Sequence, residues 1–202
     1  ALRVTEQHFN EVVNPLSKEL QTLKTDTQND IKDVNARIDG IIDDVGGAVA
    51  DGIIEEAETI VIKNSIDALN REKADIDARY TSIYNNSNLN GTPKTNLNSK
   101  YTSYGTAHTN LINSINSMIE DKIATESEKV TYNTKLNEYS NALGQLSEAF
   151  DSAINNISLN EAIAKDKALK TSLQKNIDDV SSIANAAKDA IGDYTLDGVI
   201  TE

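Results

Sequence analysis

The sequence predicts an all-α fold in which long, coiled-coil-like helices alternate with an up-down-up bundle of three helices in an elongated molecule. Three observations support this prediction. The chain of 202 residues has only two prolines, so few positions interrupt a helix. Apolar residues recur at intervals of three and four, which is the period of an α-helix. Aromatic residues make up only 4% of the chain, so a broad globular core would lack bulk.

The two ends of the chain repeat each other without a gap. Residues 23–56 align with residues 169–202 at a shift of 146 positions, and 13 of the 34 aligned residues are identical. The identical pairs include Ile31/Ile177, Val34/Val180 and Gly46/Gly192. Such a period is typical of repeat arrays, so we expect one full unit followed by the start of the next.

After an N-terminal segment at residues 1–15, the first predicted element is a coiled-coil rod over residues 16–50. Its apolar residues are spaced by three and four with mostly polar residues between them, as in a heptad seam. The residues expected to join two or three chains through this seam are Leu16, Leu20, Leu23, Ile31, Val34, Ile38 and Ile41. The alternative is an ordinary amphipathic helix that packs within its own bundle.

Residues 51–160 are predicted to form the three-helix bundle. Its helices are expected at about 54–84, 95–120 and 126–157. Thr92 and Pro93 supply an N-cap and a first-turn proline for the second helix. Thr125 and Glu128 have the spacing of a capping box before the third. Short connections between such helices favour an up-down-up arrangement.

The last long element is a second rod helix over residues 161–196, which a break at residues 158–161 separates from the bundle. Its seam keeps the register of the first rod but weakens to alanine at Ala184 and Ala187. Residues 197–202 are then the start of the next repeat.

A weaker similarity links the starts of two bundle helices. The run Asp51-x-Ile53 is followed by acidic residues, and the same pattern recurs 70 positions later at Asp121-x-Ile123. Either shared helix-start chemistry or an internal duplication explains this similarity.

The charge of the chain bears on its partners. The formal net charge is −13, from 19 basic and 32 acidic residues. Because phosphate backbones are bound by clustered lysine and arginine, we expect no nucleic-acid partner. No stretch approaches the roughly 18 apolar residues of a membrane-spanning helix, so we expect no membrane span. Cysteine is absent, which excludes disulfides and thiol chemistry.

The sequence offers little for catalysis. His8 and His108 are the only histidines, and neither lies near a recognisable nucleophile motif. His108 occupies an apolar seam, where a core histidine is the favoured interpretation. The chain has neither a glycine-rich phosphate loop nor a zinc-ligand spacing. We therefore expect no enzyme activity, no cofactor and no metal site.

The turn at Asp51 resembles part of a calcium-binding loop. With Asp51 at the fifth loop position, Glu58 falls at the twelfth, but Gly47 and Val49 occupy ligand positions without a side-chain oxygen. In the second copy Asp193 supplies such an oxygen. A tight turn that leads into a helix is the favoured interpretation, because glycine relieves the turn and acidic residues suit a helix N-terminus.

Six of the seven tyrosines fall on the three predicted bundle helices. Packing in the core and at its boundary is the favoured interpretation, because tyrosine adds bulk while its hydroxyl reaches the surface. The alternative is a stacking surface for a sugar or a partner protein, with Tyr101 and Tyr104 as the candidate binding residues.

Residues 51–63, 101–119 and 132–154 together resemble a known family. The first stretch has an Asp-Gly-x-Ile helix start, and the other two have tyrosines at helical spacing. They are similar to the helical repeats of tailed-phage or prophage minor structural proteins, which form tail tips, tail fibres and baseplates. The resemblance implies a homo-oligomer, with a trimer favoured, and other tail or baseplate proteins as partners. It also implies a place in the virion tail after assembly in the bacterial host cytoplasm.

Two functional hypotheses follow. The first is a structural or spacer segment of a phage tail-tip, tail-fibre or baseplate protein that assembles through its coiled-coil helices. The alternative is a bacterial surface binding module whose helical bundle recognises a host protein or glycan. The alternative predicts a monomer with an exposed tyrosine cluster.

Overall fold

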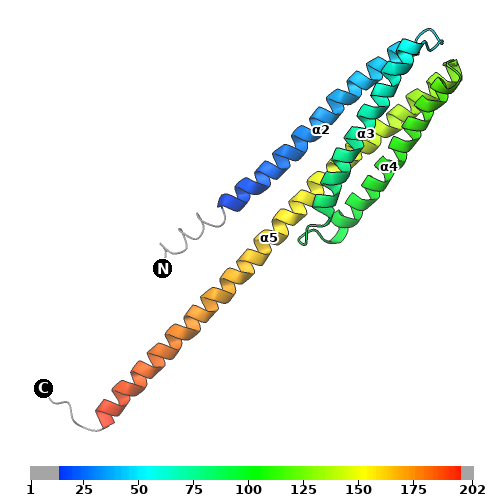
Figure 1. Cartoon of the computed structure of the whole chain (residues 1–202). Helices are drawn as coiled ribbons and strands as arrows, with labels where there is room; N and C mark the ends of the chain where they lie inside the picture. Colours follow the sequence, from blue (N-terminus) through cyan, green and yellow to red (C-terminus); the bar gives the residue numbers. More distant parts are fainter. Residues whose placement is uncertain (1–13, 197–202) are drawn as a thin grey trace. The chain divides into compact units, whose positions relative to one another are not determined.

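The computed structural model describes residues 14–196 and is all-α (Figure 1). Its helices are α2 (Asn14–Ala48), α3 (Glu56–Tyr84), α4 (Gly91–Glu120) and α5 (Glu126–Leu196). No β-strand occurs within the described residues, where Ile53 and Ile123 form an isolated antiparallel bridge. The predicted all-α class is confirmed. The predicted start of the next repeat at residues 197–202, and nearly all of the N-terminal segment, lie outside the described residues.

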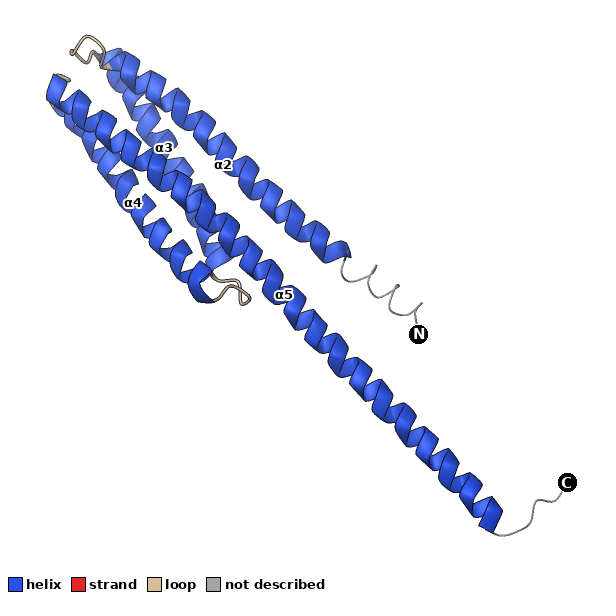
Figure 2. Cartoon of the chain, turned by 180° about the vertical axis from the view of Figure 1, so that it is seen from behind, coloured by secondary structure: helices blue, strands red, loops and turns tan. Residues whose placement is uncertain are grey.

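The chain divides into two compact units, Ala1–Ser158 and Leu159–Glu202. The first unit contains α2, α3, α4 and the first part of α5. These helices alternate in direction, and Figures 1 and 2 show the α2–α3 and α4–α5 turns at the same end of the bundle. The described part of the first unit is therefore an up-down-up-down bundle of four helices.

The core of this bundle is a continuous set of buried side chains from all four helices. Its largest fully buried members are Tyr104, Tyr139, Phe150, Ile54, Ile62, Leu69, Leu97, Leu111, Ile115, Met118, Leu143 and Leu146. Full burial of one such leucine or isoleucine contributes roughly 2 kcal/mol, before the loss of chain entropy is subtracted. Packing of mostly aliphatic side chains along the four helices thus forms a core despite the low aromatic content.

α2 departs from the prediction of a rod outside the bundle. Val34, Ile38 and Ile41 are at most 7% exposed and belong to the same core as α3 and α5. The structure therefore puts no boundary near residue 50, and α2 fits the alternative of an amphipathic helix within its own bundle. The physical reason is that α3 and α5 present further apolar side chains, among them Ile76 and Phe150, which α2 covers.

The two turns at one end of the bundle have the same local structure. Asp51 and Asp121 each accept a hydrogen bond from the backbone N–H two residues ahead, at 3.0 Å in both cases. The residue after each aspartate, Gly52 or Lys122, has a positive φ of 85° or 63°. The sequence similarity between these two helix starts therefore corresponds to a shared turn structure.

These two turns also bind each other. Ile54 N–H donates to the Lys122 carbonyl at 2.9 Å, and Ala124 N–H donates to the Gly52 carbonyl at 3.0 Å. Each turn thus donates one backbone hydrogen bond and accepts one. The reciprocal pairing fixes the α2–α3 hairpin against the α4–α5 hairpin.

The predicted helix caps are confirmed at one start and wrong at another. Thr125 N–H donates to the Glu128 carboxylate at 2.9 Å, and Glu128 N–H donates to the Thr125 hydroxyl at 3.3 Å, which is the predicted capping box. α4 instead begins at Gly91 with Asn90 as its N-cap, so the predicted cap at Thr92 is wrong. The positive φ of Gly91, 61°, lets the chain enter the helix earlier than the proline suggested.

The described part of the second unit is the remainder of α5, from Leu159 to Leu196. The break predicted at residues 158–161 is absent, because α5 is continuous there. Ser158 Oγ donates to the Ile154 carbonyl at 3.0 Å, a bond that a helix accommodates. Every side chain described in this unit is exposed or half-buried, so this helix has no core of its own.

Candidate functional site

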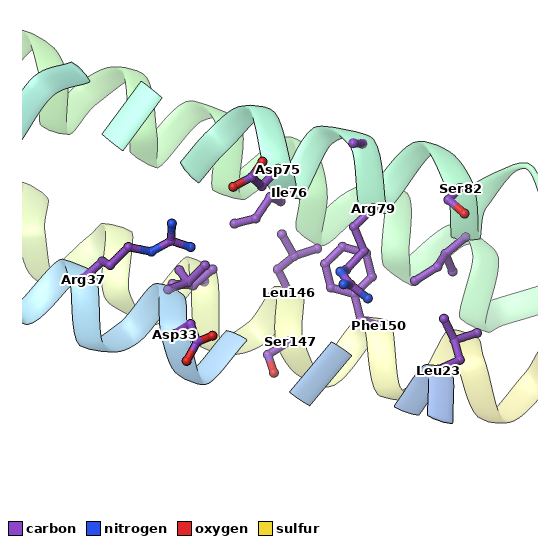
Figure 3. Close-up of a pocket in the computed structure, with 14 residues that line it drawn as sticks. Leu23, Asp33, Arg37, Asp75, Ile76, Arg79, Ser82, Leu146, Ser147 and Phe150 are labelled. Atoms are coloured by element: carbon purple, nitrogen blue, oxygen red, sulfur yellow. The ribbon is translucent and has the colours of Figure 1, made fainter. Parts of the chain in front are cut away.

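A groove of about 510 Å³ lies between α2, α3 and α5 in the first unit (Figure 3). Ile76, Leu146 and Phe150 supply much of its apolar lining. The charged residues that line it are Asp33, Arg37, Asp75 and Arg79. An apolar lining with a few charged groups is the usual composition of a binding pocket, so the contacts of these charged groups decide what the groove can do.

Arg79 connects α3 to α2 across the groove. Its Nη1 donates to the Thr27 hydroxyl at 2.6 Å, and that hydroxyl donates to the Leu23 carbonyl at 2.7 Å. Burial lowers the pKa of Arg79, and the negative charge of Asp26 opposes this effect. Because a guanidinium stays charged at physiological pH, Arg79 is a permanent polar link between the two helices.

Glu72 is a buried carboxyl group on α3. It is 1% exposed, and among the described residues neither carboxylate oxygen has a hydrogen-bond partner. Arg37 Nε lies 3.7 Å from Glu72 Oε1, which makes an ion pair beyond hydrogen-bonding distance. Burial raises the pKa of Glu72 to about 7, Arg37 opposes the rise, and Asp75 adds to it. The carboxyl group therefore changes its charge near neutral pH.

A layer of aromatic residues lies in the core near Glu72. The ring centroids of Tyr104 and Tyr139 are 5.6 Å apart, and that of His108 lies 6.3 and 6.1 Å from them. His108 Nε2–H donates to the Leu69 carbonyl at 3.2 Å. Burial raises the pKa of both tyrosines, with the charge of Glu72 adding to the rise, and burial lowers the pKa of His108. The layer is therefore neutral at physiological pH, and His108 is a core histidine.

A second group of tyrosines lies between α3 and α4. Tyr80 and Tyr101 stack with ring centroids 3.7 Å apart and an interplanar angle of 2°, and Tyr84 lies 5.1 Å from Tyr80. The Tyr101 hydroxyl donates to Asp77 Oδ1 at 2.8 Å. These rings are half-buried, so each keeps part of its surface accessible.

Tyr104 does not belong to this accessible tyrosine group. It is 0% exposed, whereas Tyr101 is half-buried, so the structure does not bring the two candidate binding residues to one surface. The reason is helix geometry: residues three positions apart differ by about 60° around the axis. That angle turns Tyr104 into the core toward Tyr139 and leaves Tyr101 at the edge.

The residues predicted to drive oligomerisation lie in different environments. Three of them are buried in the core of their own chain: Val34, Ile38 and Ile41. Leu23 is half-buried against that core. The others lie on α2, but their side chains are outside the described set: Leu16, Leu20 and Ile31. Oligomerisation through this seam stays a prediction.

The turn considered for calcium is a tight turn that leads into α3. The Asp51 carboxylate accepts the Ile53 N–H, and Gly52 supplies the positive φ that the turn requires. Among the described residues, no group of three or more histidine, cysteine, aspartate or glutamate side chains has an arrangement that could hold a metal ion. Asp193 in the second copy lies among the residues whose side chains are not described.

Sequence reasoning did not single out Arg37, Glu72 or Arg79. The signal for Glu72 was present, because it lies three residues after Leu69 and four before Ile76 on the apolar stripe of α3. A carboxyl group on such a stripe is expected to be buried. Nothing in the local sequence distinguished the two arginines from other charged residues, and only their contacts in the structure do so.

In three comparisons, no family model, curated protein or solved structure matches the chain. A further observation concerns membranes. None of the helices in the described part of the chain combines the length and apolarity that crossing a bilayer requires. The function proposed below is therefore supported by the repeat and by the contacts of the bundle.

Proposed function

We propose that the chain is a structural spacer segment of a phage tail-tip, tail-fibre or baseplate protein. The observation that carries the proposal is the organisation of α5. This single helix, Glu126–Leu196, contains both the last helix of the bundle and most of the second copy of the repeat. A seam that recurs at a fixed period is what a spacer built from repeated units requires.

The contacts in the groove support a structural role. Arg79 donates to a hydroxyl of α2, and Arg37 forms an ion pair with Glu72 of α3. Both arginines thus engage groups of the bundle itself and hold α2 to α3.

The proposal includes a homo-oligomer, with a trimer favoured, and other tail or baseplate proteins as partners. Val34, Ile38 and Ile41 are covered by helices of their own chain. An oligomer formed through this seam therefore has to open the bundle or use other seam residues, Leu16 and Leu20 among them. Sedimentation equilibrium over a range of concentrations measures the mass, and a mass of 22.0 kDa throughout would exclude self-association in this range.

Location provides the test of the function. Antibodies raised against the 202-residue chain should label tails when virus particles are induced and purified from the bacterium that carries the gene. Immunogold electron microscopy reads the label, and peptide mass spectrometry of the same particles identifies the chain. Label on the bacterial surface, with particles free of the chain, would overturn the tail assignment and favour the alternative.

The alternative function is a bacterial surface module that binds a host protein or glycan. The half-buried stack of Tyr80, Tyr84 and Tyr101 favours it, because stacked aromatic rings are common in carbohydrate and protein recognition. A glycan array probed with the whole chain tests it. Binding that Tyr84→Ala abolishes and that Tyr132→Phe, a change at a tyrosine only 3% exposed, retains would support this alternative.

A further inference from the structure

The second part of α5 carries a stripe of exposed apolar side chains. Its members, with their exposed fractions, are Leu173 (44%), Ile177 (58%), Val180 (66%), Ile183 (69%) and Ile191 (65%). They recur at helical spacing and lie on one face. Single exposed apolar residues are ordinary. An aligned row of five along one helix is instead an apolar surface whose exposure to water is unfavourable.

The repeat shows what covers such a stripe. At the shift of 146 positions the exposed residues align with positions of α2. Of the four α2 counterparts whose side chains are described, Arg37 is exposed and three are buried: Thr27 (0%), Val34 (3%) and Val45 (0%). α3 and the first part of α5 cover them in one continuous core. The same helix face therefore occurs twice in this chain, once covered and once uncovered.

We propose that the exposed stripe of α5 is the docking surface for a further three-helix unit of the kind formed by residues 57–158. In this arrangement residues 169–196 take the place that α2 has in the first bundle. The occupant is a unit without a first helix of its own. This inference goes beyond the spacer function and holds wherever the protein is located.

An intact second copy of this chain is a poor occupant. Its own α2 already covers its three-helix unit and is covalently attached, so α2 competes at high effective concentration. α2 also has the larger side chains, because Ile38 and Ile41 stand where α5 has Ala184 and Ala187. Exchange of α2 for α5 would leave cavities at both positions, and each lost isoleucine side chain costs core stability.

The differences between the copies specify the chemistry of the occupant. Arg37 forms the ion pair with Glu72, and the residue that aligns with Arg37 is Ile183. A glutamate opposite Ile183 would be buried without a positive partner, which is strongly unfavourable. The occupant should therefore carry an apolar residue at the position of Glu72.

The same reasoning applies to Arg79. It donates to the Thr27 hydroxyl, and the residue that aligns with Thr27 is Leu173. A leucine offers no acceptor for a guanidinium, so the occupant should also be apolar at the position of Arg79. Two positions thus distinguish the expected occupant from the three-helix unit already present in this chain.

The turn sequence supplies an independent argument. In the first bundle the Asp51 turn pairs with the Asp121 turn through two backbone hydrogen bonds. The second copy ends in the same Asp-Gly-x-Ile sequence, which begins at Asp197. An occupant of the proposed kind brings a turn like that at Asp121, so it would match the second copy in this sequence motif as well as along the helix face.

A chain extended at its C-terminus tests the proposal. Residues 57–158 are joined directly after Glu202, which preserves the register because Glu202 aligns with Glu56. In one version the appended copy carries Glu72→Leu and Arg79→Leu, and in the other it is unchanged. Hydrogen exchange with mass spectrometry then measures the protection of residues 169–191 in both versions and in the 202-residue chain.

We expect amide exchange over residues 169–191 to slow by at least about tenfold in the version with the two substitutions. The reason is that a docked helix has to open before its backbone amides can exchange. The unchanged version should protect them less. Val180→Asp should remove the protection. The matched control Val130→Asp, which changes a valine of equal exposure (64% against 66%) elsewhere on α5, should not.

Three outcomes would overturn the proposal. Exchange over residues 169–191 that is as fast in the extended chains as in the 202-residue chain shows that this face does not accept the unit. Equal protection in both extended versions removes the role of the two positions. Protection in the 202-residue chain that rises with concentration, together with a doubled mass, shows that a second copy covers the stripe.

Discussion

The two copies of the repeat carry similar seams and lie in opposite environments. Val34 on α2 is 3% exposed, whereas its counterpart Val180 on α5 is 66% exposed. The sequence spacing is the same in both, so the difference comes from the helices that cover α2 and not from the helix itself. The comparison teaches that a heptad-like seam indicates that a helix packs against other helices. The seam does not show whether those helices belong to the same chain or to another.

The largest effect is expected from placing a charge on each copy of the seam. Val34→Asp should lower the free energy of unfolding by roughly 3 kcal/mol or more, because the carboxylate enters a packed core. Val180→Asp should change it by less than about 0.5 kcal/mol, because its side chain is in water. Urea titration followed by tyrosine fluorescence reads the bundle, since six of the seven tyrosines lie in it. Equal losses would break the comparison.

The next effect concerns the charge of Glu72, which Arg37 on the first copy of the seam partly balances. The pKa of Glu72 is raised to about 7, so the folded chain binds more protons than the unfolded chain between about pH 4.5 and 7. The stabilisation is fully present below the unfolded pKa and is lost as the pH rises through the folded pKa. The loss should approach about 3 kcal/mol by pH 8.

Glu72→Gln isolates this contribution, because the rest of the acidic chain titrates equally in both proteins. Denaturant titrations at pH 4.5, 6, 7 and 8 should show a smaller fall in stability with pH for the variant than for the native chain. Parallel curves for the two proteins would show that the native carboxyl group titrates as an ordinary exposed glutamate.

A third change makes the first copy resemble the second. Arg37→Ile removes the positive charge that forms an ion pair with the Glu72 carboxylate, so stability at pH 8 should fall by about 1–2 kcal/mol. Adding Glu72→Leu should restore most of the lost stability, because a buried apolar pair replaces the ion pair. A double-mutant cycle at pH 8 measures the coupling, and additive effects would mean that the two side chains act independently.

The smallest effect is expected at the turns. Lys122 has a positive φ of 63°, whereas the corresponding residue of the matching turn before α3 is Gly52. Lys122→Gly should therefore raise the midpoint of thermal unfolding slightly, by relief of roughly 0.5–1 kcal/mol of backbone strain. Loss of the exposed ion pair between Lys122 and Glu56 should cost little stability. Calorimetry checks the direction, and a lowered midpoint would show that this ion pair outweighs the strain.

Much of the fold could be predicted because its signals are local. The capping box at Thr125 and the helical spacing along each segment depend on neighbours within a few residues. The break predicted at Ser158 was wrong for a related reason, since polar residues alone do not end a helix whose backbone hydrogen bonds continue. The placement of α2 and of Tyr104 could not be read in this way, because both depend on helices distant in sequence.

The sequence by itself determined the all-α class, the capped start of α5 and the repeated seam, since periodicity and hydrogen bonds between near neighbours act within one segment. The tertiary structure alone decided that Val34 is covered and Val180 is not, that the Asp51 and Asp121 turns bind each other, and that Glu72 is buried beside Arg37. Burial and pKa depend on the side chains that surround a group in space, and these come from segments that no local pattern connects.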